Sequence, residues 1–153
     1  MLSPLHAART ACEHSNGTLD PLSLQKILYL AQLFSIGTGE KAIDANFIAT
    51  DFGPVIQSVY RHTNIYGIRP IKYIPFHAEK LQTDEKSEQL IREVTGELAH
   101  KNLAWLVGQT QWRHGAWAKA YRPNIKIMIT DCDILEEYRN RQSHFVTRCS
   151  EHA

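Results

Sequence analysis

The residues best suited to proton transfer in this chain are two histidines and one aspartate. Asp51 precedes a predicted helix that carries His62, and a nearby carboxylate can orient a histidine for acid–base chemistry. His114 lies between Trp112 and Trp117, in reach of an aromatic pocket. The simpler interpretation is a helix-capping aspartate, an exposed His62 and a partly buried, hydrogen-bonded His114. The common nucleotide-loop, nucleophile-elbow and zinc-protease motifs do not occur. We therefore expect no enzyme, with a small enzyme at these residues as an alternative.

Four further side chains are of the types that bind zinc. Cys12 and His14 form one pair, and Cys149 and His152 form another. The two pairs lie at opposite ends of the chain and lack the two close knuckles of a zinc finger. Surface residues are the simpler interpretation, and we expect neither a metal nor a cofactor.

A third constellation is polar and helical. Gln25, Tyr29 and Gln32 share one face of a predicted helix, and Lys26 lies beside them. A tyrosine flanked by amides and a lysine can both pack and form hydrogen bonds, which makes these four residues candidates for a partner-binding face. The alternative is an internal polar network that locks the helix to the turn at Gly53-Pro54.

Basic and aromatic residues also alternate late in the chain, as they do in proteins that bind single strands. They are Arg113, Lys119, Arg122 and Lys126, with Trp112, Trp117 and Tyr121. The whole chain has 17 Lys and Arg against 16 Asp and Glu, a net charge of +1. Nucleic acid is therefore not the expected partner, and a packed aromatic cluster is the simpler interpretation.

Seven segments have helical signals. In six of them an N-cap, a proline at the first position or an apolar stripe indicates the helix. These helices are predicted over residues 3–14, 20–36, 54–66, 84–100, 102–112 and 130–141, with a short helical turn over 115–121. Strand signals fall on residues 47–50, 71–75 and 126–129. The pattern predicts an α+β fold, mainly α-helical, with about six helices and a small β-sheet or hairpin.

The length of 153 residues fits one compact domain, which we place over residues 1–141. The polar residues 142–153 have the composition of a disordered tail. No apolar run reaches the roughly 20 residues that span a bilayer, so no membrane partner is expected. Three widely spaced cysteines do not make a disulfide framework, and we expect a cytoplasmic protein with reduced thiols.

Three blocks, read in order, carry a family resemblance. They are Leu24 to Gln32, then Phe52-Gly53-Pro54-Val55 with Tyr60, then Gly115-Ala116-Trp117. Together with the strand and helix that follow, they resemble the Panacea domain of SocA-like, phage-associated antitoxins over roughly residues 20–140. Phe52 and Leu30 stand where that pattern often has tyrosine. Neither change is expected to alter the fold.

The resemblance implies a function and partners. Panacea proteins resemble antitoxins of toxin–antitoxin systems, often carried by phages and prophages, in which the domain binds and neutralises a cognate protein toxin. Some members are thought to deliver the toxin to a protease system, and a proteolytic adaptor or regulator without a toxin is the other alternative. The resemblance assigns no catalytic residues.

Six motif residues are expected to be structural. We expect Gly53 and Pro54 to form a sharp turn between a strand and the start of a helix, with Val55 and Tyr60 pointing inward. Gly115 is expected to let Trp117 fold back against its own helix.

Overall fold

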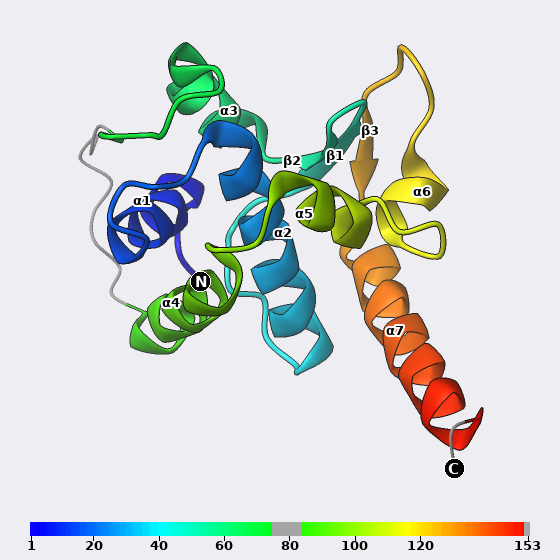
Figure 1. Ribbon diagram of the computed structural model, residues 1–153. Coiled ribbons are helices and arrows are strands. Elements are labelled where there is room, and N and C mark those ends of the chain that lie inside the picture. Colours follow the sequence, from blue (N-terminus) through cyan, green and yellow to red (C-terminus); the bar gives the residue numbers. More distant parts are fainter. Residues whose placement is uncertain (75–83, 152–153) are drawn as a thin grey trace.

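The computed structural model describes residues 1–74 and 84–151 (Figure 1). Seven α-helices, one 3₁₀ helix and three strands make up this part of the chain. In chain order they are α1 (Pro4–His14), α2 (Pro21–Gly37), β1 (Phe47–Thr50), β2 (Gly53–Val55), α3 (Gln57–Thr63), η1 (Asn64–Tyr66), α4 (Glu85–Leu98), α5 (Leu103–Thr110), α6 (Ala116–Ala120), β3 (Ile127–Ile129) and α7 (Asp131–Glu151). The predicted fold class, α+β and mainly helical, is confirmed.

Helix α2 is the centre of the fold (Figure 1). It begins where the sequence predicts, because Asp20 caps the backbone N–H of Ser23 at 2.9 Å and Pro21 follows. It contacts α1, α3, α4, α5, α7 and β2. Leu24, Ile27 and Leu28 of its stripe are completely buried. Since α2 is covered on nearly all sides, its polar side chains are enclosed together with its apolar ones.

The sheet has the order β2-β1-β3, with β1 antiparallel to both neighbours. Phe47 pairs with Ile129, and both side chains are buried. Phe47 packs edge-on against Tyr29 of α2, with ring centroids 5.1 Å apart. One face of the sheet therefore closes the core over α2. Ile48 and Met128 pair on the opposite face, where Met128 is exposed.

Other predicted helix starts are also confirmed by their caps. Ser3 accepts from His6 N, Asp84 from Ser87 N and Asn102 from Trp105 N. Local hydrogen bonds of this kind depend on residues three positions apart, which is why they are visible in the sequence. The predicted strands over 47–50 and 126–129 are present as β1 and β3.

The segment around Gly53-Pro54 differs from the prediction. Gly53–Val55 is strand β2, and the helix begins only at Gln57. The sharp turn precedes Gly53 instead of following it. Because the helix starts three residues later, Tyr60 faces outward and is 53% exposed, so its predicted inward position is wrong. Pro54 is tolerated in a strand of only three residues at the sheet edge.

Two other predictions change. Residues 71–74 form no strand, although Ile71 and Ile74 are buried, and Pro75 lies outside the described residues. The last helix does not end near Arg141: α7 continues to Glu151, since no glycine or proline interrupts it. Residues 152 and 153 lie outside the described part. Among the described residues, no helix is both long and apolar enough to cross a membrane.

Candidate functional site

Side chains from distant parts of the chain converge on the turn between β1 and β2, residues 50–53, which we name the turn site. Lys26 Nζ of α2 donates to the Phe52 carbonyl at 2.5 Å. Trp117 Nε1 of α6 donates to the Thr50 carbonyl at 2.8 Å. The three sequence blocks that carry the family resemblance therefore meet at one place.

Further polar groups of the turn also form hydrogen bonds. The Thr50 hydroxyl donates to the Gly53 carbonyl at 2.9 Å and accepts from Phe52 N at 3.1 Å. Tyr121 OH donates to the Asp51 carboxylate. Gly53 has a φ of +99°, and a Cβ there would lie 3.0 Å from Lys26 Nζ. The positive φ favours a glycine, and a Cβ would in addition displace the lysine from its close position.

This arrangement holds an aromatic side chain out of the protein. Phe52 is 65% exposed, although the backbone on both sides of it is hydrogen-bonded by side chains of α2 and α6. A ring presented on a fixed backbone loses little conformational entropy when it binds. The turn site is thus a preorganised, exposed aromatic contact.

Lys26 is an unusual support for the turn because it is 1% exposed. It donates a hydrogen bond to a neutral carbonyl, and none of the described residues forms an ion pair with it. Burial lowers the pKa of Lys26, while the charge of Asp20 raises it to a smaller extent. The ammonium group therefore carries a desolvation cost in the folded chain.

This cost predicts a pH dependence. Because the pKa of Lys26 is lower in the folded chain than the usual value near 10.5, the unfolded chain binds more protons between these two values. The contribution of Lys26 to the free energy of unfolding therefore increases as the pH rises between these two values. Urea unfolding from about pH 7 to about pH 10.5 should show wild-type stability rising relative to Lys26→Met. A constant difference between the two proteins across this range would contradict a depressed lysine pKa.

The four residues predicted as a partner-binding face are all buried: Gln25, Lys26, Tyr29 and Gln32. The two glutamines each make a pair of hydrogen bonds with a single backbone residue. Gln25 bonds Ile56 N and O at 2.9 and 3.1 Å, and Gln32 bonds Ile43 N and O at 2.9 and 2.8 Å. The alternative of an internal polar network describes this geometry. A partner could reach these side chains only if α2 were uncovered, so direct binding by them stays an untested prediction.

Tyr29 belongs to a second buried network, which sequence reasoning missed. Its hydroxyl donates to Glu137 Oε1 at 2.8 Å, and the backbone N–H of Ala116 donates to the same oxygen at 2.8 Å. Arg141 Nε donates to Glu137 Oε2 at 2.9 Å. Burial, and then the neighbouring Glu137 charge, raise the pKa of Tyr29, so that it remains a hydrogen-bond donor.

A sequence signal for Glu137 existed. It lies between Ile134 and Tyr138 on the inward stripe of α7, where a glutamate is out of place unless it has partners. Glu137 is 2% exposed and joins α2, α6 and α7. It also explains Gly115, where a Cβ would lie 2.5 Å from Glu137 Oε1.

The residues considered for acid–base chemistry do not come together in one constellation. Asp51 is engaged by Tyr121, and His62 Nδ1 lies 2.8 Å from the Ser58 carbonyl one helical turn earlier. His114 packs against Trp112 and His144, with ring centroids 5.1 and 4.9 Å away. Among the described residues, His114 forms no ion pair with a carboxylate.

The basic and aromatic residues are largely paired within the chain. Lys119 lies 2.8 Å from Asp133 and 3.1 Å from Glu136. Trp117 and Tyr121 stack on each other at 4.6 Å between centroids. The geometry is that of a packed cluster, as in the simpler interpretation of the sequence.

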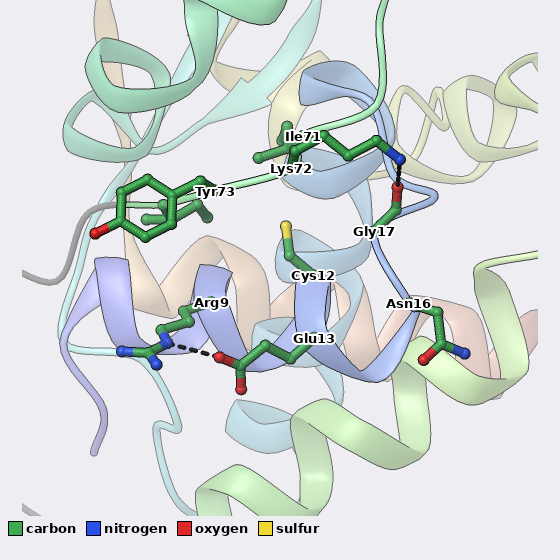
Figure 2. Close-up of a pocket in the computed structure, with 9 residues that line it drawn as sticks. Arg9, Cys12, Glu13, Asn16, Gly17, Ile71, Lys72 and Tyr73 are labelled. Atoms are coloured by element: carbon green, nitrogen blue, oxygen red, sulfur yellow. Dashed lines mark hydrogen bonds and ion pairs between the residues drawn. The ribbon is translucent and has the colours of Figure 1, made fainter.

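A separate pocket of about 610 Å³ lies between α1 and residues 71–74 (Figure 2). Cys12 and Ile71 line it together with an Arg9–Glu13 ion pair of 2.7 Å, and Lys72 donates to the Gly17 carbonyl at its edge. Burial, and then the Glu13 charge, raise the pKa of the Cys12 thiol to about 12. A thiol with this pKa is protonated at neutral pH and is a poor nucleophile.

A zinc site was a second possibility for Cys12. The described residues contain no group of three or more His, Cys, Asp or Glu side chains placed to hold a metal. The side chain of Cys149 and the whole of His152 lie outside the described part.

These features define a class: a small α+β domain in which buried amides and charges of a central helix hold a turn that presents an aromatic ring. The family model for the antitoxin SocA-like Panacea domain matches residues 24–118, well over half of the chain. The protein therefore belongs to the SocA-like Panacea family, and its antitoxin-like character follows from that membership. Comparison with curated proteins and with solved structures gave no match.

Proposed function

We propose that this protein is an antitoxin that binds a cognate protein toxin and neutralises it by direct contact. The observation that carries the proposal is the family match over residues 24–118, which includes Lys26, Gly53 and Trp117 of the turn site. These residues hold a surface feature in place, which suits a protein that acts through binding. We propose that the protein binds its toxin in the cytoplasm.

We further propose that the protein is not an enzyme. The titratable residues that could serve a reaction are already engaged within the chain: Asp51 with Tyr121, Glu137 with Tyr29 and Arg141. Burial keeps the thiol of Cys12 protonated. Inhibition by such a protein should be stoichiometric, since each toxin molecule must remain bound.

A protease system is a proposed second partner. In that case the complex would deliver the toxin for degradation, and the protein would act as an adaptor. The two modes differ in a measurable way, because neutralisation by contact leaves the toxin level unchanged, whereas delivery lowers it.

The decisive experiment is co-expression with the product of the neighbouring gene. We expect that product alone to stop growth, and co-expression to restore growth and yield a complex that survives size-exclusion chromatography. Titration of purified proteins should give full inhibition at a fixed molar ratio. A harmless neighbour, or rescue without a complex, would contradict neutralisation by direct contact. Immunoblotting of the toxin during rescue tests delivery to a protease.

A further inference from the structure

We propose that the turn site is the surface that docks the toxin, with Phe52 as the side chain that inserts into it. The partner surface that fits is an apolar pocket large enough for a phenyl ring and bordered by carboxylates. This inference rests on the proposed antitoxin function and assigns the contact within it.

Keeping Phe52 outside the core has a cost for the folded chain. Phe52 is 65% exposed, so most of its apolar surface stays in contact with water, which is unfavourable relative to burial. The chain nevertheless fixes the backbone that carries this ring, with a buried lysine, an indole N–H and a glycine at positive φ. The folded chain itself buries only a minor part of Phe52, so the arrangement favours contact with something outside it.

Two lysines place positive charge at the turn. Lys26 lies directly beneath the turn. Lys126 is exposed and immediately precedes Ile127, the β3 partner of Ala49, which places it next to Thr50 at the turn end of the sheet. Neither lysine forms an ion pair with any described residue.

A third cation, Arg122, is held by carbonyl groups of its own segment. It follows Tyr121, whose hydroxyl reaches the turn, and its Nη1 donates to backbone carbonyls of Lys119 and Tyr121. The one carboxylate of the turn, Asp51, is engaged by that tyrosine hydroxyl. This hydrogen bond leaves Asp51 charged, so Lys26 and Lys126 together exceed it by one positive charge at the turn, and that excess is complementary to an acidic rim.

A protein fits these features better than single-stranded nucleic acid does. Binding to a single strand uses a row of exposed rings on which successive bases stack. Here Trp117 and Tyr121 stack on each other, with an interplanar angle of 15°, and Phe52 is the exposed ring of the turn. One protruding ring with a charged border resembles the anchor residue at the centre of a protein interface.

The test uses the wild-type protein and four variants with the purified product of the neighbouring gene. Phe52→Ala removes the anchor, and Tyr73→Ala is its control, because Tyr73 is similarly exposed, at 68%, and lines the pocket beside α1 (Figure 2). Lys126→Glu reverses the charge at the turn, and Arg139→Glu reverses an exposed charge on α7. Thermal unfolding is measured for all five proteins.

We expect Phe52→Ala to weaken the complex by about 30-fold or more with little change in melting temperature, since its ring is exposed. Tyr73→Ala should bind like wild type. Lys126→Glu should slow association and reduce its salt dependence, whereas Arg139→Glu should not. Growth rescue should be weakened by Phe52→Ala and by Lys126→Glu, and it should be unchanged for Tyr73→Ala and Arg139→Glu.

The outcomes separate the two proposals. If wild type binds and Phe52→Ala binds equally well, the docking surface is wrong and the antitoxin function stands. If wild type forms no complex, the function fails and the docking surface fails with it. Two further outcomes would overturn the inference, because the ring would then bind something other than the toxin. One is a Phe52-dependent dimer of this chain in sedimentation velocity. The other is Phe52-dependent binding of a poly-dT oligonucleotide without an effect on the toxin complex.

Discussion

Replacement of Glu137 by alanine is expected to lower the free energy of unfolding by about 3–5 kcal/mol, the cost of breaking a buried charge network. Tyr29 OH and Ala116 N lose the oxygen to which both donate at 2.8 Å. Arg141 keeps its bonds to Gln109 but loses the carboxylate that balances its charge. The substitution thereby removes the side chain that links helices α2, α6 and α7 by hydrogen bonds.

Urea denaturation gives the measurement, and Glu136→Ala provides the control. Glu136 is adjacent in the sequence, but its side chain is 58% exposed and paired with exposed Lys119. Surface pairs contribute little, so the control should change stability by less than about 1 kcal/mol. Equal effects of the two substitutions would contradict the role of Glu137 as a buried junction. Because Ala116 begins the helix that carries Trp117, Glu137→Ala should also loosen the turn site.

Gly37→Ala is expected to destabilise the protein by about 2–3 kcal/mol through overpacking. A Cβ at this position would lie 2.2 to 2.5 Å from three atoms of the Tyr138 ring, including Cγ at its base. The ring cannot swing away at its far end, so α7 must shift relative to α2. In an ordinary helix the same substitution would be favourable.

The matched control is Gly108→Ala in α5. A Cβ there meets no atom within 4 Å, so the change should raise stability by about 0.5–1 kcal/mol. The double substitution Gly37→Ala with Tyr138→Ala tests the cause, because removal of the ring should relieve most of the added cost of the methyl group. If Gly37→Ala proves as favourable as Gly108→Ala, the close packing of α2 against α7 is wrong.

The sequence alone determined the local structure and the family. Helix starts at Ser3, Asp20 and Asn102 depend on a cap and a backbone N–H within the same turn, so adjacent residues contain all the information needed. The spacing of Leu24, Ile27 and Leu28 likewise identifies a buried stripe without knowledge of what covers it. The order of the three motif blocks indicated the Panacea family, which the family model confirms.

Tertiary structure decided where the polar residues lie. The spacing of Gln25, Tyr29 and Gln32 places them on one face of a helix. Such a face of mixed polarity can form hydrogen bonds either with solvent or with other backbone segments, and the local sequence does not distinguish the two. Ile56 and Ile43, whose backbone groups satisfy the two amides, are 31 and 11 residues away. Glu137 is 108 residues from Tyr29. Burial of a polar group depends on whether a distant partner arrives to replace water, and that partner is visible only in the folded chain.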